Sequence, residues 1–311
     1  MSEIKPAIPH PGWPKVFIKL MKLRVIVLLQ ITAICAILVH DMLSRHGLID
    51  VDRSWKDTFF ASLITIVGGT LSAGGSNAIN MWFDADIDQH MRRTQNRPVP
   101  LGHISANGAL IFGIIIAVLG SALFLIVSWK AAFWSFFSVL FYVLIYTIWL
   151  KRRTPQNIVI GGAAGAFPPV IGWTISTGTL SIEPLAFFLI IFFWTPSHFW
   201  ALSLYKSGDY KKAKIPMLPI ISGTKTTKIN ILVYALIMSP AVLAPYFFNF
   251  ASTIYLIITS IMTTYYIYLC FKLYSSKIAK ASNKIARKIF IYSIFYLFFI
   301  FLILLIDNIL K

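Results

Sequence analysis

Nine apolar runs dominate this 311-residue sequence, and each is long enough to cross a lipid bilayer as a helix, which takes about 20 residues. Hydrophobic residues make up 58% of the chain and charged residues only 13%, whereas soluble domains are about 45–50% apolar and about 25% charged. We therefore predict an all-α polytopic membrane protein: one transmembrane domain over 1–311, with nine helices in one bundle. The expected spans are 23–42, 58–82, 108–128, 131–150, 157–176, 184–204, 230–248, 252–272 and 287–307.

Lysine and arginine are shared unequally between the two faces that these spans would create. The amino-terminal segment through Arg24 and the even-numbered connections hold 23 of the 28 basic residues. Because cytoplasmic loops carry the excess of Lys and Arg, the pattern predicts an N-inside, C-outside topology with 1–22 as a cytoplasmic segment. Topology and attraction to anionic membrane lipid also account for the net charge of +17, so no nucleic-acid partner is expected.

The cysteines and the amino terminus indicate where such a chain would reside. Cys35 and Cys270 lie within expected spans, and no CxxC or CxxCH motif occurs, so neither a disulfide framework nor covalent haem attachment is indicated. No small-residue cleavage site follows the basic lead segment, and we expect the first span to be retained. The lead is too short and too poor in Arg and Ser for an organelle transit peptide, which leaves a bacterial inner membrane as the simplest location.

Two polar connections, about 83–106 and 205–229, follow the second and the sixth spans. Their period of four helices keeps the two halves in one orientation, as in a parallel internal repeat. We therefore expect two cytoplasmic loops to meet over a single cavity. The last three spans are almost free of polar residues and are expected to form scaffold or lipid-facing wall. Small residues late in the second span, "GGTLSAGGSN", should let helices approach closely.

The first polar connection places Asn80, Asp84 and Asp88 four residues apart. If the second helix continues through residue 88, these side chains form one stripe with neighbours about 6 Å apart. Magnesium binds one or two carboxylates together with waters and substrate phosphates, which such a stripe would suit. The alternative is a solvated helix end, where carboxylates are mildly destabilising and need an offsetting positive charge. Spacing alone does not choose between the two interpretations.

The basic residues around this stripe favour a phosphate ligand. Arg93 and Arg97 are four apart, and guanidinium groups bind phosphate oxygens in a bidentate manner. The positive-inside rule explains each arginine equally well. In the second polar connection, Asp209 would face Asp84 and Asp88 across the cavity and complete a two-sided clamp on metal and diphosphate.

His198 lies inside the sixth span. Ionisable groups within a span usually face the bundle interior and serve function. From the residue alone, a hydrogen-bonded packing role is the more common interpretation of a lone histidine.

Several of these segments resemble motifs of the UbiA superfamily of intramembrane prenyltransferases and, within it, of the protohaem IX farnesyltransferases, or haem O synthases. The spacing N-x3-D-x3-D at 80–88 resembles the first Asp-rich motif of the superfamily. The narrower resemblance covers about residues 20–220 and rests on four motifs in the right order. They are "D-x2-M-x-R-T-x2-R-P" at 88–98, "Y-T-x2-L-K-R" at 146–152, "N-I-x-I-G-G-A-A-G-A-x-P-P-x-x-G-W" at 157–173, and "W-T-P-x-H-F-W-A-L" at 194–202 with "D-Y-x2-A-x2-P-M-L-P" at 209–219.

The resemblance implies transfer of a farnesyl group from farnesyl diphosphate to a vinyl group of haem B, with addition of water, to give haem O and diphosphate. It implies Mg²⁺ as cofactor and haem B as substrate. A haem A synthase or a terminal-oxidase assembly factor would be a fitting protein partner. The implied catalytic residues are Asn80, Asp84, Asp88, Asp209 and Tyr146, with Asp84, Asp88 and Asp209 as metal ligands. The implied diphosphate-binding residues are Arg93, Arg97, Lys151, Arg152 and Lys206, and the implied haem-binding residue is His198, with His90 and His103 as loop alternatives.

The sequence departs from the family pattern at two positions. Gly208 stands where the family often has an acid before Asp209, which leaves the number of magnesium ions open. Ser197 replaces a proline of the "TPPHFW" form. Lys22 and Arg24, at the cytoplasmic end of the first span, would suit a propionate or a phosphate, and topology alone explains them as well.

Two rival functions share part of this pattern. A prenyltransferase for an aromatic quinone precursor shares the Asp-rich motif but would not need "HFWAL" or "GAFPPVIGW". A secondary transporter would place ionisable groups near mid-membrane in both halves. The acids of this chain gather instead at one face, which disfavours transport.

Overall fold

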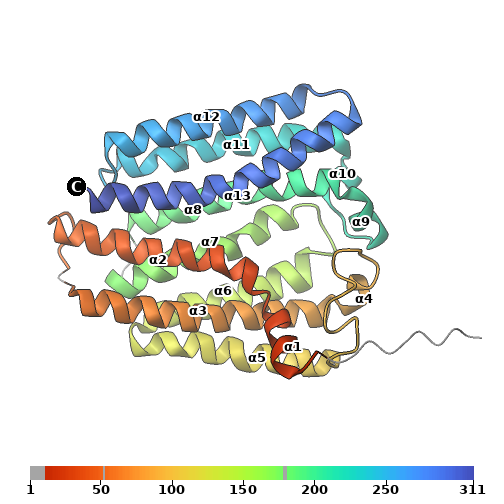
Figure 1. The fold of residues 1–311 in the computed structure, drawn as a ribbon, viewed down its shortest axis with the longest axis horizontal. Helices are drawn as coiled ribbons and strands as arrows, with labels where there is room; N and C mark the ends of the chain where they lie inside the picture. Colours follow the sequence, from red (N-terminus) through yellow and green to blue (C-terminus); the bar gives the residue numbers. More distant parts are fainter. Residues whose placement is uncertain (1–10, 52, 178–180) are drawn as a thin grey trace, which may run out of the picture.

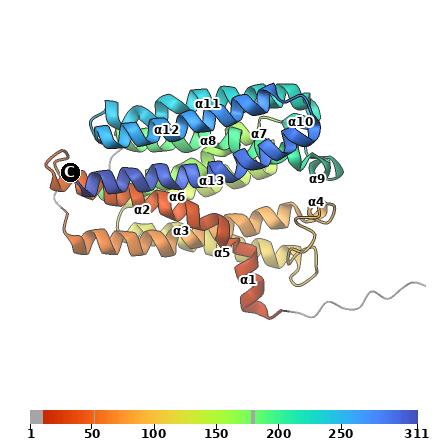
Figure 2. The same cartoon turned by 45° about the horizontal axis from the view of Figure 1, so that its top comes forward.

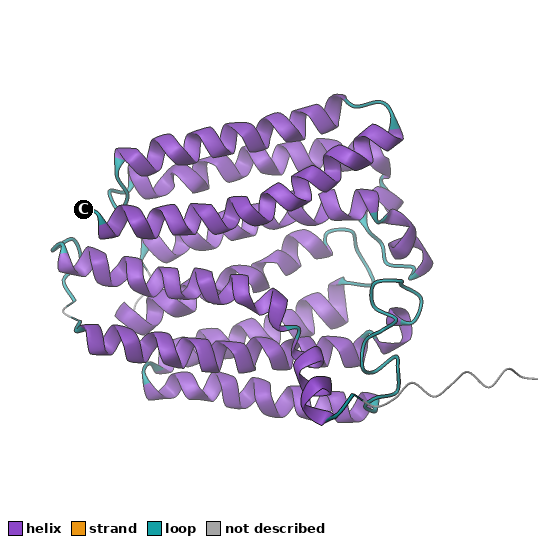
Figure 3. Ribbon diagram, in the orientation of Figure 1, coloured by secondary structure: helices purple, strands orange, loops and turns teal. Residues whose placement is uncertain are grey.

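The computed structural model describes residues 11–51, 53–177 and 181–311. Within these ranges the chain forms helices and no strand, and nine helices are long and apolar enough to cross a membrane, as expected (Figure 3). The elements are α1 (Trp13–Met21), α2 (Leu23–Arg45), α3 (Trp55–Phe83), α4 (Ala85–Asp88), α5 (Ala106–Leu123), η1 (Phe124–Ile126), α6 (Trp129–Leu140), η2 (Phe141–Leu150), α7 (Asn157–Thr177), α8 (Ile182–Tyr205), α9 (Ser207–Lys212), α10 (Leu218–Ile221), α11 (Gly223–Phe247), α12 (Thr253–Ser275) and α13 (Ala279–Ile309).

Serine side chains fix where several spans begin. The hydroxyl of Ser54 accepts from the backbone N–H of Asp57, whose carboxylate accepts from the Ser54 N–H in return, so α3 starts with a capping box. Ser105 and Ser128 cap α5 and α6: each serine side chain accepts from the backbone N–H three residues later, without the reciprocal bond of a capping box. These caps satisfy backbone donors that would otherwise be left without a partner at the membrane surface.

The long helices run side by side, and the polar connections gather at one end of the bundle. Figure 1 shows α4, α9 and α10 together at that end, with the carboxyl terminus at the opposite end. The expected meeting of the two polar connections is therefore confirmed. The second connection is shorter than the predicted 205–229, because α9 and α10 fold within it and α11 already begins at Gly223.

Helices α3 and α5 approach each other through glycines. A Cβ atom on Gly75 would lie 2.4 Å from the carbonyl oxygen of Gly113, and one on Gly120 would lie 2.3 Å from the backbone nitrogen of Ser72. Larger residues at these positions would force the backbones apart. The small residues of the second span thus act as the sequence predicts.

Helix α1 lies across the end of α3 and turns sharply into α2 at Lys22 (Figure 2). Val16 and Leu20 are buried in one apolar cluster with Ala78 and Met81 of α3. The turn places Lys22 in the left-handed region, with φ 55°. Part of the segment 1–22 is therefore a helix packed on the bundle, and residues 1–10 lie outside the described ranges.

The opposite end of the bundle holds a buried polar network centred on Asp41 of α2. One of its carboxylate oxygens lies 2.7 Å from His40 Nδ1 and 3.0 Å from Arg53 Nε, and the other accepts from Thr58 Oγ1 at 2.6 Å. Asp41 is fully buried, and Arg53 neutralises its charge. The network joins the two helices of the first hairpin, α2 and α3.

Candidate active site

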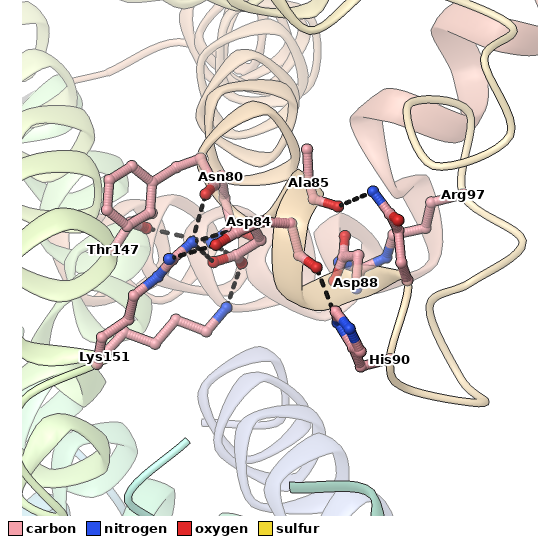
Figure 4. A network of polar contacts seen from close by, with 12 residues as sticks. Asn80, Asp84, Ala85, Asp88, His90, Arg97, Thr147 and Lys151 are labelled. Carbon is pink, nitrogen blue, oxygen red and sulfur yellow. Dashed lines mark hydrogen bonds and ion pairs between the residues drawn. The ribbon is translucent and has the colours of Figure 1, made fainter. Parts of the chain in front are cut away.

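Asp84 lies where α3 ends, and its carboxylate is fully buried at the polar end of the bundle (Figure 4). The carboxylate oxygen Oδ2 accepts from Asn80 Nδ2 at 2.9 Å and also forms an ion pair with Lys151. Asn80 Nδ2 further contacts Thr147 Oγ1 at 3.3 Å. The network thus joins Asn80 and Asp84, at the end of α3, to Lys151, which lies 67 residues after Asp84 in the sequence.

The other two aspartates of the segment pair with different arginines. Asp88 is buried and receives Arg97 Nη1 at 2.8 and 2.7 Å on its two oxygens. Asp86 is exposed and binds Arg152 in a bidentate manner at 2.8 and 2.7 Å. The Arg152 hydrogen bond holds the pKa of the Asp86 carboxyl below its usual range. Each acid in this segment is therefore already neutralised by a basic side chain.

Lys22 joins this network from the α1–α2 turn. Its Nζ donates to Asn80 Oδ1 at 3.0 Å, which leaves the Asn80 amide nitrogen to face Asp84. Burial, followed by the positive charges of Arg97 and Lys151, lowers the pKa of the Lys22 ammonium well below its ordinary value.

A small cavity of about 60 Å³ lies between these charged groups. Both halves of the chain contribute to its wall, as the parallel repeat predicts. The wall residues are Asp88, Met91, Arg93, Arg97, Tyr146, Lys151, Ile158, Phe199, Tyr210, Ile215 and Met217.

Tyr146 reaches the cavity from a π-helical stretch, η2, at the end of the fourth span. The backbone N–H of Lys151 bonds to the carbonyl of Tyr146, five residues earlier. Gly161 of α7 makes room for the tyrosine ring, because a Cβ there would lie 2.2 Å from Tyr146 Cδ2. Local π geometry often occurs at functional sites, and here it directs Tyr146, Thr147 and Lys151 toward the acids.

Six of the expected residues lie outside the cavity wall: Asn80, Asp84, Arg152, His198, Lys206 and Asp209. Lys206 is exposed, Asp209 is half-exposed, and Arg152 is engaged by Asp86. The described ranges contain no group of three or more His, Cys, Asp or Glu side chains close enough to hold a metal ion, so Asp209 does not complete such a cluster with Asp84 and Asp88. The second polar connection contributes Tyr210 instead, and burial raises the pKa of its hydroxyl.

His198 lies next to this cavity, since its ring contacts that of the wall residue Phe199 at 5.1 Å between centroids. The imidazole is stacked between Trp194 at 4.2 Å and Phe290 at 4.6 Å, and its Nδ1 lies 2.6 Å from Ser293 Oγ. Phe290 and Ser293 belong to α13. Helix α13, one of the three spans expected to be scaffold or lipid-facing wall, therefore packs directly against His198.

A second, larger cavity of about 520 Å³ lies between α2, α3 and α13. Its wall is apolar except for a few side chains such as Gln30 and Thr70. Val27 and Ile66 in the wall are also exposed on the outside of the bundle, where lipid would surround the protein. The volume lies within the range of about 300–1,000 Å³ that is usual for small-molecule sites.

The donor set around Asp84 fits a divalent cation. Asp84 Oδ1 is buried and accepts no hydrogen bond from any residue in the described ranges, whereas Oδ2 is engaged. Together with Asp88, it offers two carboxylates, which is the number that Mg²⁺ commonly takes from a protein when phosphates supply other ligands. Lysine and arginine nearby would bind those phosphates.

Comparisons with known proteins identify the family. A family model described as the UbiA prenyltransferase family matches residues 42–303. The chain belongs to this family. The expected enzyme class, a prenyltransferase, is thereby confirmed.

Relatives within the UbiA family cover nearly the whole chain. A protoheme IX farnesyltransferase of Pelagibacter ubique is 54% identical over 293 residues, which are 94% of this chain and 92% of that protein. A protein of the same name from Parvibaculum lavamentivorans is 46% identical over 300 residues, covering 96% and 90% of the two chains. The resemblance seen in the motifs is therefore confirmed over almost the full length.

Solved structures share the fold. A digeranylgeranylglyceryl phosphate synthase superposes with a TM-score of 0.76 at 19% identity, over 96% of this chain and 99% of that one. A UbiA homologue from Archaeoglobus fulgidus gives a TM-score of 0.65 at 17% identity, over 93% and 99%. At these identities the likeness concerns the fold, and it confirms the UbiA-type bundle.

Two contacts of the site are absent from the expectations. Thr147 stands within the "Y-T-x2-L-K-R" motif, so its place beside Tyr146 was a usable signal. Ser293 lies in an apolar span, and nothing in the surrounding sequence marks it as a partner of His198. Its role emerges only when α13 packs against α8.

Proposed function

We propose that this UbiA-family enzyme transfers the farnesyl group of farnesyl diphosphate to a vinyl group of haem B, giving haem O. The observation that carries the proposal is the 54% identity to the Pelagibacter ubique protoheme IX farnesyltransferase across 94% of this chain. The buried acids and the basic groups around them support it, because they suit a metal-bound diphosphate.

Asp84 and Asp88 would hold Mg²⁺ in this proposal. The Archaeoglobus fulgidus homologue of the same fold is described as bound to GPP and Mg²⁺. Asp84 Oδ1, which accepts no hydrogen bond in the described ranges and lies 3.9 Å from Arg152 Nη2, offers a ligand here. When bound, the ion would neutralise charge on the departing diphosphate. Asp209 would become a third ligand only if α9 moved toward the two buried acids.

Exchange of ion-pair partners would open the site. The cavity of about 60 Å³ is too small for farnesyl diphosphate, and Lys151 and Arg97 are bound to Asp84 and Asp88. Diphosphate would attract the two basic side chains and release the carboxylates for the cation. Metal and diphosphate should therefore bind together, because either alone would leave a buried charge without a partner.

The basic residues would then act on the leaving group. Lys151 and Arg97, joined by Arg93, would stabilise the negative charge that develops as the C1–O bond of farnesyl diphosphate breaks and the bonding pair leaves with diphosphate. Asn80, held by Lys22, would orient the nearest phosphate. Arg152 and Lys206 would contribute at longer range.

The rest of the reaction needs an apolar setting. Tyr146 would present its ring to the allylic cation, since π faces attract cations. The vinyl group of haem B would attack C1 of the farnesyl group, which leaves a carbocation on the vinyl carbon next to the porphyrin. A water molecule would add to this carbocation and lose a proton, giving the hydroxyl group. His198 would contact the haem, and the larger apolar cavity offers a route from the lipid for these hydrophobic substrates.

We place the protein in a bacterial inner membrane with the site at the cytoplasmic end. The high Lys and Arg content of that end supports this orientation. A haem A synthase or a terminal-oxidase assembly factor would be a fitting recipient of the product.

Mass spectrometry of reaction products tests the proposed function. Purified protein in lipid nanodiscs would be incubated with Mg²⁺, farnesyl diphosphate and haem B, in parallel with an aromatic quinone precursor in place of haem. We expect haem O in the first reaction and no prenylated product in the second. Prenylation of the quinone precursor with no haem O would overturn the choice of acceptor.

A further inference from the structure

Ser293 of α13 fixes two side chains of α8 at once. Its backbone carbonyl accepts from Trp194 Nε1 at 2.8 Å, and its hydroxyl oxygen lies 2.6 Å from His198 Nδ1. Ser293 is fully buried and His198 is only 7% exposed, so water does not compete for these contacts. The imidazole cannot rotate without breaking the bond or leaving the stack between Trp194 and Phe290.

The Ser293 hydroxyl has one proton, and it is engaged elsewhere. Ser293 Oγ donates to the carbonyl oxygen of Phe290 at 2.7 Å, one turn earlier in α13. We assign the Ser293 proton to the Phe290 carbonyl, and with that assignment the contact between Ser293 Oγ and His198 uses a proton on Nδ1. In a neutral imidazole, Nε2 then carries a lone pair, and no residue in the described ranges donates to it.

This arrangement matches what an iron ligand requires. A ligating histidine donates its other ring N–H to a fixed acceptor, which sets both the tautomer and the ring orientation. Neutral imidazole is the form that binds haem iron. The contact with the cavity-wall residue Phe199 places the ring beside the candidate active site.

We propose that Ser293 is a positioning residue that holds His198 with the Nε2 lone pair directed to the iron of the haem substrate. The inference rests on the proposed function for the identity of the acceptor. It goes beyond that function in assigning a role to α13 and a single tautomer to His198. Haem would then be oriented by a ligand bond before the farnesyl group is transferred.

Absorption spectra of the full-length protein titrated with ferric haem B would test this role. The variants are His198→Ala, Ser293→Ala and Ser293→Thr, with Tyr296→Phe as the matched control. Tyr296 lies one turn further along α13 and loses a buried bond to Thr263 at 2.8 Å without touching His198. We expect His198→Ala to lose the spectrum of a histidine-ligated haem and added imidazole to restore it.

Ser293→Ala should weaken haem binding about tenfold or more, as loss of the partner of a ligating histidine does, and should give a mixed spectrum. Ser293→Thr and Tyr296→Phe should resemble the wild type. If Ser293→Ala is lost during purification, Ser293→Cys provides the comparison, with a weaker acceptor of similar size. A wild-type spectrum and affinity in Ser293→Ala, or a retained spectrum in His198→Ala, would refute the inference.

The two proposals fail separately. Wild-type protein that binds haem through His198 yet makes no haem O would contradict the proposed function and leave the positioning role standing. Protein that makes haem O, with haem bound identically in all variants, would contradict the positioning role alone.

Discussion

Asp84 and Asp86 are two positions apart, yet their carboxylates lie in different surroundings. Asp84 is fully buried beside Asn80 and Lys151, whereas the Asp86 side chain is 64% exposed and pairs with Arg152. At the end of the helix, residues two positions apart point to different sides, so Asp84 faces the bundle interior and Asp86 faces outward. The pair therefore offers an internal comparison for the role of charge in the site.

We predict that Asp84→Asn lowers kcat about 100-fold or more. The substitution keeps the shape of the side chain but removes the buried negative charge that would bind the metal ion on the diphosphate. Asp86→Asn should stay within a few-fold of the wild type, since its partner lies at the surface. Haem O formation at saturating substrates measures both, with thermal unfolding as the control for folding. Equal losses in the two variants would contradict the assignment of Asp84.

We predict that Lys22 makes the affinity for farnesyl diphosphate depend on pH in the alkaline range. Because its pKa is lowered by burial and by Arg97 and Lys151, the ammonium loses its proton at a lower pH than an ordinary lysine does. Affinity for farnesyl diphosphate should therefore fall as the pH rises through that lowered pKa. Lys22→Arg, which keeps its charge at all these values, should remove this decline.

Binding of farnesyl diphosphate measured between pH 7 and 10 would test the prediction. Lys19→Arg, on α1 and outside the contact network, is the control and should keep the wild-type decline. A profile in Lys22→Arg that matches the wild type would show that another group titrates.

Residue spacing and sequence motifs were sufficient to predict contacts between residues one helical turn apart. Asn80 and Asp84 are four residues apart, and their contact was predictable. The second helix does not continue through residue 88 as supposed, because α3 ends at Phe83, and Asp88 lies in α4 and pairs with Arg97. Asp209 and Lys206 were harder, because the fold of a 17-residue connection, 206–222, decides whether they face inward. There the chain turns Tyr210 inward and leaves the charged residues outside.

At the scale of whole elements, α3 and α5 pack closely through their glycines. The glycines of both helices remove the side chains that would separate their axes, and α3 carries Asn80 and Asp84 at its end. A change in the α3–α5 distance would therefore move the acids relative to Lys151. Sequence composition predicted the close approach but not its partner helix.

We predict that Gly120→Ala destabilises the protein by about 1–3 kcal/mol, because the new methyl would meet the Ser72 backbone nitrogen at 2.3 Å. Gly165→Ala, with no atom within 4 Å of the added Cβ, should be neutral. Thermal unfolding in detergent compares the two variants. A stability of Gly120→Ala equal to that of Gly165→Ala would mean that the helices part easily.

The π-helical stretch η2 is the element that sequence could not predict. Its residues are aromatic and aliphatic, as in any span, and no proline or glycine marks the change of hydrogen bonding. The geometry depends on packing against α7, where Gly161 admits the Tyr146 ring. Tertiary contacts thus decide a local conformation that intrinsic preference leaves open.

For the molecule as a whole, the number and order of spans could be predicted because lipid demands long apolar helices. The structure confirms all nine within the described ranges and places the carboxyl terminus away from the site end. Helix ends differ from the expected bounds by up to eight residues, as at Ala279, where α13 begins in place of the expected 287. Caps such as Ser54 lie outside the apolar runs. Which end faces the cytoplasm stays a prediction.

We predict that Lys311 faces the periplasm and Arg92 the cytoplasm, because the amino-terminal segment through Arg24 and the even-numbered connections hold 23 of the 28 basic residues of the sequence. Single cysteines introduced at these two exposed positions, after replacement of Cys35 and Cys270, would be labelled in intact cells with a reagent that does not cross the membrane. Labelling at position 311 alone is expected. Labelling at position 92 alone would reverse the topology.

The Asp41–Arg53 pair has a consequence for how the chain is made. Both residues belong to the hairpin of α2 and α3, one near the end of α2 and the other just before α3. The hairpin can cancel its own buried charge before any later helix is synthesised, which lowers the cost of releasing it into lipid. Biogenesis of this enzyme can thus begin with a two-helix unit whose buried carboxylate at this end already has its counter-charge.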